Sequence, residues 1–188
     1  MKPDRAEILR YMKMGAASPS PELAARIDKV ERAIVAAAAP RIFIRCERIE
    51  RRGTDADGKA LFDFGGLALA SNDLARVLKD CDEAYLIVAT LGSGVDQVQR
   101  RLAVLSGLDA LIAQATGASL IESFLDEEQA KLGATTPRFS PGYGDLALAN
   151  QRAFLAFMDS SRTVGVTLTD RLLMAPSKSV TAIAGARK

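Results

Sequence analysis

The sequence predicts an α+β fold, and three observations indicate it. Several segments place apolar residues at the spacing of a helix face, and residues 84–91 form an apolar run rich in strand-forming residues. Helical and extended segments follow one another without the steady alternation that is typical of a doubly wound parallel sheet. The chain has 188 residues, and because chains generally divide only beyond ~250 residues, we expect one domain over residues 1–188.

Two helices are predicted at the start of the chain. A short helix covers residues 4–14 and a longer one covers residues 21–38. Ser20 provides the N-cap of the longer helix, Pro21 is its first residue, and Pro40 ends it. One face of this helix carries apolar residues spaced by three and four, namely Leu23, Ile27, Val30 and Ile34.

Strands are predicted next. Apolar and charged residues alternate over residues 41–50, which is typical of a half-exposed strand. A turn at Asp55-Ala56-Asp57-Gly58 leads into a returning strand over residues 60–64. Ser71 then caps a helix that runs to Lys79. We expect residues 84–91 to be the central buried strand.

The second half of the chain predicts more helix. Ser93 and Asp96 resemble a capping box and open a helix to about residue 105. A long helix over residues 108–132 ends at Gly133. Two prolines and two glycines predict a loop over residues 137–145. The remaining segments are a helix over residues 148–160 and short strands over residues 165–184, interrupted by Pro176.

Several classes of function are excluded by composition. The chain has no histidine, which removes the commonest general base and every Ser-His or Cys-His nucleophile pair. Cys46 and Cys81 lie far apart in sequence, so the spacing of a zinc or iron–sulfur site is absent. We expect both to be buried thiols in a reducing compartment, and we expect neither a metal site nor a catalytic residue in this chain.

Membranes and nucleic acids are not expected partners. No apolar run approaches the ~20 residues of a membrane-spanning helix, and the N-terminus lacks the apolar stretch of a secretory signal. Basic residues are not interleaved with aromatic ones, as they are in many nucleic-acid-binding surfaces. We therefore expect a cytoplasmic protein.

The segment from 138 to 145, Arg-Phe-Ser-Pro-Gly-Tyr-Gly-Asp, is the densest unusual local sequence. Pro141 fixes one backbone angle, and Gly142 permits conformations and close approaches that other residues avoid. Arg138 offers a forked guanidinium that suits a carboxylate, and Tyr143 offers an aromatic face with a hydroxyl. These groups fit a zwitterionic ligand that carries a carboxylate and an adenine. A tight surface turn is the alternative interpretation.

Together with the segments that follow, this loop resembles the activation (reactivation) domain of cobalamin-dependent methionine synthase, in particular its short stand-alone relatives. The family's Arg-x-x-Pro-Gly-Tyr pattern is complete from Arg138 to Tyr143. Gly-Val-Thr-Leu-Thr at residues 165–169 and Pro-Ser-Lys-Ser-Val at residues 176–180 follow at similar spacing, and residues 7–11 and 89–92 also look like those relatives. The resemblance implies a single curved α+β domain with an antiparallel or mixed sheet flanked by helices.

The resemblance also implies that S-adenosylmethionine lies against the loop. The matching positions are Arg138, Ser140, Pro141, Gly142, Tyr143 and Glu122. Arg138 is expected to hold the ligand carboxylate, and the backbone of Ser140 and Gly142 to meet polar groups of the ligand. Glu122 is the best match for a helix glutamate that contacts the ligand, with a solvated helix face as the alternative.

Function and partners follow from the same resemblance. In the family, a corrinoid cobalt that has decayed to Co(II) is restored by one-electron reduction and methylation by S-adenosylmethionine. We therefore expect this chain to bind S-adenosylmethionine and to serve cobalamin held by another protein, such as a methionine synthase lacking its own activation domain. A flavodoxin-type reductant is a further expected partner. Lys178 and Arg171 are candidate contacts to the partner or its corrinoid, with a solvated lysine as the alternative for Lys178.

A second function stays open, namely a non-catalytic module that senses S-adenosylmethionine or docks on a corrinoid protein. Ala118 stands where the large enzyme of the family has an aspartate, one helical turn before the ligand-contacting glutamate. The large enzyme also has a C-terminal tyrosine at its ligand, for which this sequence has no counterpart. Both departures favour the second function.

Overall fold

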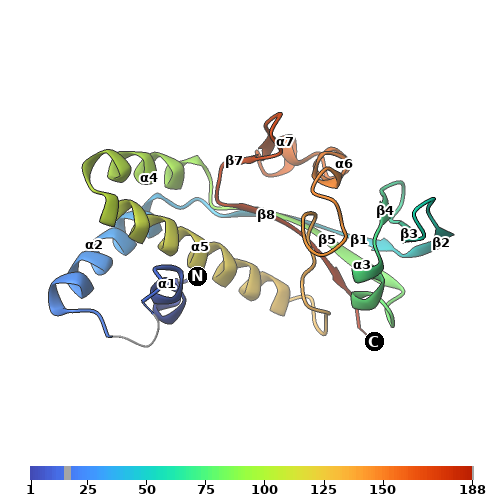
Figure 1. The fold of residues 1–188 in the computed structure, drawn as a ribbon, viewed down its shortest axis with the longest axis horizontal. Helices are drawn as coiled ribbons and strands as arrows, with labels where there is room; N and C mark the ends of the chain where they lie inside the picture. Colours follow the sequence, from blue (N-terminus) through green and yellow to red (C-terminus); the bar gives the residue numbers. More distant parts are fainter. Residues whose placement is uncertain (15–17, 188) are drawn as a thin grey trace. The chain divides into compact units, whose positions relative to one another are not determined.

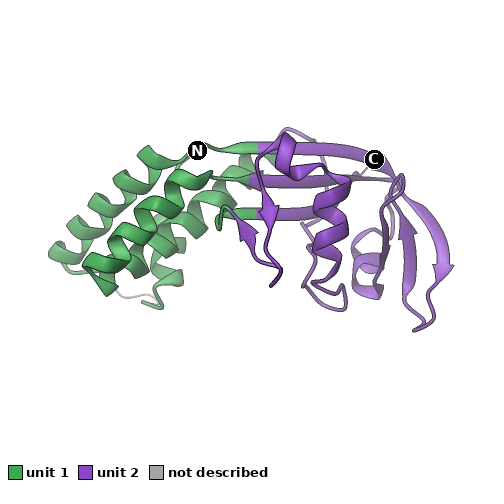
Figure 2. Ribbon diagram, turned by 90° about the horizontal axis from the view of Figure 1, so that it is seen from above, with its two compact units in different colours: residues 1–41, 90–128, 176–179 green, residues 42–89, 129–175, 180–188 purple. Residues whose placement is uncertain are grey.

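A computed structural model describes residues 1–14 and 18–187 of the chain (Figure 1). The contacts within the chain divide it into two compact units, each assembled from separate segments (Figure 2). Unit 1 comprises Met1–Arg41, Thr90–Glu128 and Pro176–Ser179, and unit 2 comprises Ile42–Ala89, Gln129–Ala175 and Val180–Lys188. Whether residues 1–188 fold as one domain stays a prediction.

Unit 1 is built mainly from helices. These are α1 (Arg5–Tyr11), α2 (Pro21–Ala37), α4 (Ser93–Leu105) and most of α5 (Gly107–Ala130). The predicted cap of α2 is confirmed, since the Ser20 hydroxyl accepts a hydrogen bond from the Leu23 N–H at 3.3 Å. The apolar faces of these helices form a buried core that includes Ile8, Ile27, Val30, Ile34, Val95, Ile112 and Leu120.

The predicted capping box at the start of α4 is wrong. The N-cap is Gly92, at φ +80°, and no side chain caps the helix there. The Asp96 carboxylate instead accepts hydrogen bonds from the backbone N–H and the hydroxyl of Ser177, at 2.9 and 2.6 Å. The Asp96 carboxylate therefore makes a charge-assisted contact with the segment Pro176–Ser179 of unit 1 and does not cap its own helix.

Unit 2 contains most of a three-stranded sheet in the order β1 (Arg41–Arg48), β5 (Glu83–Thr90) and β8 (Ser179–Gly185). The expectation for residues 84–91 is confirmed, since β5 is the middle strand and nearly all of its side chains are buried. Consecutive side chains of a strand point to opposite faces of the sheet, so a strand that is buried on both faces has a nearly continuous apolar run.

Two antiparallel sheets complete the strands. One has the order β2 (Glu50–Thr54), β3 (Ala60–Asp63) and β4 (Ala68–Ala70), and the other pairs β6 (Thr167–Leu168) with β7 (Met174–Ala175). The turn before β3 is confirmed, because the Gly58 N–H donates to the Asp55 carbonyl at 3.1 Å.

The single strand predicted over residues 41–50 is wrong, since β1 ends at Arg48 and β2 begins at Glu50. The break falls at Ile49, whose side chain is buried and whose N–H donates to the Asp82 carbonyl at 2.8 Å. The strand β4 was not predicted, because three small and apolar residues carry too little alternation to be recognised.

The remaining helices are α3 (Asn72–Val77), α6 (Asn150–Phe157) and α7 (Ser160–Thr163). The first two are shorter than predicted, and α7 was not predicted. Arg51 donates to the carbonyls of Leu78 and Cys81, both at 2.9 Å, and this fixes the turn at which the chain leaves α3. Asp159, at φ +45°, separates α6 from α7. These elements enclose the core of unit 2, which includes Phe62, Phe64, Leu69, Leu74, Leu86, Phe154, Leu155 and Ile183.

The two cysteines differ in exposure. Cys81 is buried in the core of unit 2, as expected, and burial raises the pKa of its thiol. Cys46 lies exposed on β1, so the expectation that it is buried is wrong. Over the described ranges, 1–14 and 18–187, no helix has both the length and the apolarity needed to cross a membrane.

Candidate functional site

The predicted loop over residues 137–145 is confirmed and is fastened to β8 within unit 2. The Phe139 N–H donates to the Ile183 carbonyl at 2.9 Å, and the Ile183 N–H returns a bond to the Phe139 carbonyl at 2.7 Å. One step along, the Ser140 hydroxyl donates to the Thr181 carbonyl at 2.6 Å. The start of the loop is therefore held at the edge of a strand, which leaves the following residues to project from it.

A tight turn follows at residues 140–143. The Tyr143 N–H donates to the Ser140 carbonyl at 3.1 Å, with Pro141 and Gly142 between them. Gly142 has φ +95°, so the turn has proline at its second position and a glycine of positive φ at its third. That combination is typical of a type II turn, which explains why these two residues occur together here.

The second half of the loop closes on itself. The Gly142 N–H donates to the Leu146 carbonyl at 2.8 Å, and the Leu146 N–H donates to the Tyr143 carbonyl at 3.0 Å. Pro141 is buried beneath the turn, whereas Gly142, Tyr143 and Gly144 are exposed. The loop thus presents backbone and one aromatic side chain on a rigid frame.

Tyr143 is the most prominent group on this surface, with 64% of it exposed. Its ring lies 6.4 Å from that of Phe139, measured between centroids, at an interplanar angle of 51°. Phe139 is half-buried, so its contact with the Tyr143 ring restricts the motion of that ring and leaves most of it exposed. An exposed, steadied ring of this kind can stack with a planar ligand group.

Arg138 is half-buried at the start of the loop, and Gln129 is one of its hydrogen-bond partners. Its Nη1 donates to the Gln129 side-chain oxygen at 2.8 Å. The Gln129 amide nitrogen in turn donates to the Thr135 hydroxyl at 2.6 Å and to the Thr136 carbonyl at 3.0 Å. Sequence reasoning missed Gln129, because a single glutamine near the end of a helix carries no motif of its own.

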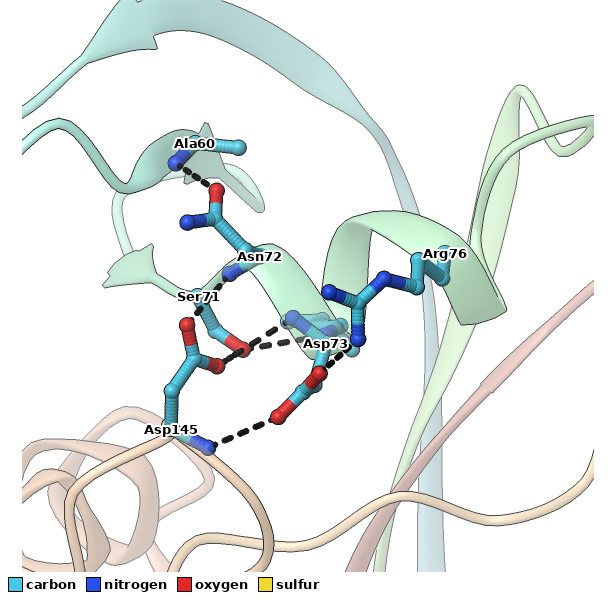
Figure 3. A network of polar contacts seen from close by, with 7 residues as sticks. Ala60, Ser71, Asn72, Asp73, Arg76 and Asp145 are labelled. Atoms are coloured by element: carbon cyan, nitrogen blue, oxygen red, sulfur yellow. Dashed lines mark hydrogen bonds and ion pairs between the residues drawn. The ribbon is translucent and has the colours of Figure 1, made fainter.

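Asp145 connects the loop to α3, as Figure 3 shows. Its carboxylate accepts hydrogen bonds from the Ser71 hydroxyl, from the Asn72 N–H at 2.8 Å and from the Asp73 N–H at 3.2 Å. Its own N–H donates to the Asp73 carboxylate at 3.0 Å. Ser71 also caps α3 as predicted, by accepting from the Leu74 N–H at 2.9 Å. Two residues therefore share the capping of one helix.

These donors stabilise the charged form of Asp145. The hydrogen bond from Ser71 contributes most, followed by the backbone bonds from Asn72 and Asp73 and by the charge of Lys59, and together they lower the pKa of Asp145 to about 2. Lys59 also donates to the Asp145 carbonyl at 2.8 Å. The far end of the loop is thus pinned to the start of α3 by a carboxylate that is ionised at neutral pH.

The other predicted residues lie elsewhere in the chain. Arg171 is exposed in the connection between β6 and β7, in unit 2. Glu122 is half-buried on α5, and Lys178 is half-buried in the segment Pro176–Ser179; both residues belong to unit 1. The structure therefore brings together Arg138, Ser140, Pro141, Gly142 and Tyr143 on one loop of unit 2.

Both the backbone and the side chain of Lys178 are held by contacts within unit 1. Its carbonyl accepts a hydrogen bond from the Leu91 N–H at 2.9 Å, and its side chain crosses α5 at Gly117. A Cβ at Gly117 would lie 2.9 Å from both the Lys178 Cε and the Gln99 Nε2, so a larger residue there would displace these side chains. Burial lowers the pKa of Lys178, although the nearby charge of Asp96 opposes this shift.

Comparison with known proteins identifies the fold. No family model matches the sequence, and no curated protein matches it. The structure is similar to one described as the crystal structure of the MetH reactivation domain bound to AdoHcy, with a TM-score of 0.59. The match covers 94% of this chain and 72% of that chain, at 14% sequence identity. The chain therefore has the fold of that reactivation domain, an α+β arrangement of helices and antiparallel sheets, as the sequence predicts.

Proposed function

We propose that this chain binds S-adenosylmethionine at residues 138–143 and supports reductive methylation of a corrinoid held by a partner protein. The observation that carries the proposal is the pairing of an Arg138 guanidinium held by Gln129 with a tight turn whose Gly142 and Tyr143 are exposed. It occurs in a fold similar to that of a protein solved with AdoHcy, the demethylated product of S-adenosylmethionine.

The groups on the loop fit the chemistry of this ligand. The Arg138 guanidinium can hold the carboxylate, because its fork matches two carboxylate oxygens. Tyr143 offers an exposed ring for the adenine. The Ser140 carbonyl and the Gly142 N–H already bond within the loop, so the expected backbone contacts are those of the Ser140 N–H and the Gly142 carbonyl. Glu122 is proposed to receive the ligand ammonium.

The proposed reaction requires that the methyl group of S-adenosylmethionine be correctly positioned, and it requires little acid–base chemistry. S-adenosylmethionine supplies an intrinsically electrophilic methyl group. The corrinoid cobalt of the partner takes one electron from a reductant and then accepts that methyl group, and S-adenosylhomocysteine is released. The role of this chain is to orient the ligand and to keep the sulfonium methyl accessible to a second protein. The absence of histidine from the sequence is compatible with such a role.

The partners follow from the reaction. The corrinoid protein is proposed to be a cobalamin-binding protein or a methionine synthase without its own activation domain, with electrons from a flavodoxin-type reductant in the cytoplasm. Arg171 and Lys178 are proposed contacts, and Arg171 is exposed at the end of a hairpin where a partner can reach it. Proteins that meet in this way use surface charge to orient their encounter.

Methyl transfer from labelled S-adenosylmethionine tests the proposal. The purified chain alone should bind the ligand without consuming it. Label should move to cobalt when reduced cobalamin is supplied, and faster when a protein carries the cobalamin. Steady consumption of S-adenosylmethionine on a small-molecule acceptor, with no cobalamin present, would rule the proposal out.

A second function is favoured by one residue. Ala118, half-exposed on α5, has no carboxylate at the position where the related large enzyme has an aspartate. The chain would then sense S-adenosylmethionine, or dock on a corrinoid protein, without methyl transfer. The same assay distinguishes the two functions, because a sensor binds the ligand but leaves its methyl group in place with every corrinoid tested.

A further inference from the structure

Within unit 1, the junction of α4 and α5 exposes large aliphatic side chains to water. Val104 is 88% exposed, Leu105 71%, Leu111 44% and Leu108 39%, and the two helices meet between them at Ser106 (Figure 1). We call these four residues the α4–α5 corner. A single exposed aliphatic side chain is ordinary, but four of them within eight residues, two on each side of a helix junction, form an unusual concentration of apolar surface.

The corner is rigidly supported from its other side. Arg26, on α2, pairs with the Asp109 carboxylate and donates to the Ser106 hydroxyl at 2.8 Å. The Ser106 hydroxyl also accepts from the Asp109 N–H at 3.3 Å, and the Ser106 N–H donates to the Leu102 carbonyl at 2.9 Å. The backbone of the junction is therefore fixed by polar contacts, while its aliphatic side chains have no such cover.

Exposed basic residues border the corner. Residues 97–121 contain Arg100 and Arg101, both exposed on α4, and Asp109 is the one acidic residue among them. The hydrogen bond from Arg26 lowers the pKa of Asp109, so this carboxylate is ionised and already matched by a cation. The aliphatic corner is thus bordered by two arginines.

We propose that the α4–α5 corner is a docking surface for a protein segment that has an aliphatic centre flanked by acidic side chains. Leu108 and Leu111 lie three residues apart on α5, which is the spacing at which one helix packs against another. Arg100 and Arg101 then meet the acidic flank, which gives the partner its orientation.

Two other occupants fit the corner less well. A second copy of this chain, paired about a two-fold axis, places the same surface on itself and brings arginines against arginines. A membrane surface is usually met by tryptophan or tyrosine at the level of the head groups, and residues 97–121 contain no aromatic residue. An aliphatic, acidic protein segment satisfies both features of the corner.

The test uses two synthetic helical peptides with leucines at positions i, i+3, i+4 and i+7. One carries glutamates beside the leucines and the other carries lysines. Fluorescence anisotropy should show the glutamate peptide binding the whole chain about tenfold more tightly at low salt, with a smaller preference at high ionic strength. Reversing the charges with Arg100→Glu and Arg101→Glu should reverse the preference between the peptides.

Variants locate the surface. Replacing the most exposed aliphatic residues, with Val104→Ser and Leu105→Ser together, should abolish binding of both peptides. Leu173→Ser is the matched control, because Leu173 is 63% exposed but belongs to unit 2, and it should bind like the unchanged chain. Circular dichroism shows that each variant keeps its helices.

Three results would overturn the proposal. The first is peptide affinity that the Val104→Ser, Leu105→Ser variant leaves unchanged. The second is a dimer, detected by sedimentation, that this variant abolishes, since the occupant would then be a second copy. The third is binding to phosphatidylserine vesicles through the corner with no binding of the glutamate peptide, since the occupant would then be a lipid surface. None of these measurements depends on S-adenosylmethionine.

Discussion

The guanidinium of Arg138 donates to the side-chain oxygen of Gln129 at 2.8 Å, and Gln129 is itself held by two threonines of the following segment. The arginine proposed to bind the ligand carboxylate is therefore oriented before the ligand arrives. Orientation in advance reduces the side-chain entropy that binding must remove.

Replacing Gln129 with leucine should weaken S-adenosylmethionine binding without abolishing it. The lost hydrogen bond leaves Arg138 present but less constrained, so we expect roughly a three- to tenfold loss of affinity. Isothermal titration calorimetry measures this loss. The entropy of binding should become less favourable in the variant, whereas a Gln129 that serves only the fold would change stability and leave the affinity alone.

The ionisation of Asp145 should appear in the acid stability of the protein. Its pKa is about 2 in the folded chain, which is below its ordinary value, so it stabilises the fold fully above about pH 4. That contribution is lost as the pH falls from about 4 to 2. Urea unfolding should show Asp145→Asn losing less stability than the unchanged chain over this interval. Asp57→Asn, at an exposed turn, is the control and should retain the original slope.

Gly144→Ala should destabilise the loop more than an ordinary glycine substitution. Gly144 has φ +51°, and a Cβ there would lie 2.9 Å from the Asp73 Cγ and closer still to its Oδ2. We expect a loss of about 2–4 kcal/mol, which combines backbone strain with overpacking. Gly58→Ala is the matched control, because Gly58 has φ +76° with nothing within 4 Å of its Cβ position, and it should lose only about 1 kcal/mol. Equal losses in thermal or urea unfolding would remove the proposed role of the Asp73 contact.

Gly117→Ala should displace the Lys178 side chain from its position against α5. The added methyl group would lie 2.9 Å from both the Lys178 Cε and the Gln99 Nε2, and we expect the longer lysine side chain to move away. Because burial lowers the pKa of Lys178, its release should raise that pKa toward the ordinary value for lysine. Titration of the lysine side-chain resonances by NMR measures the shift. A pKa that stays unchanged in a folded Gly117→Ala variant would mean that the lysine is not seated there.

Much of the fold could be predicted because the signals were local. Ser20 and Ser71 act as caps, and the run predicted at residues 84–91 is the middle buried strand β5 (Glu83–Thr90). Pro141 with Gly142 forms the turn that their backbone preferences favour. Each of these depends on a few neighbouring residues. The α+β class followed from the same periodicities.

The errors arose where a distant partner decided the outcome. Asp96 was expected to cap its own helix but bonds to Ser177, which is 81 positions away in the sequence. Asp145 shares the capping of α3 from a loop 72 to 74 positions away. Gln129 could not be recognised because its role depends on where Arg138 lies in the folded chain. Neither periodicity nor turn chemistry carries such information.

The most direct measurement of the central proposal is calorimetric titration of the Arg138→Ala variant with S-adenosylmethionine. The account predicts that the unchanged chain binds the ligand and that the variant loses ~1.5–3 kcal/mol, the usual worth of a charge-assisted hydrogen bond. Arg138→Lys should recover only part of the loss, because an ammonium lacks the forked geometry. The control is Arg162→Ala, an exposed arginine of α7 in the same unit, which should bind with the original affinity. If a folded Arg138→Ala variant binds S-adenosylmethionine as tightly as the unchanged chain, the ligand does not bind at this loop and the account is contradicted.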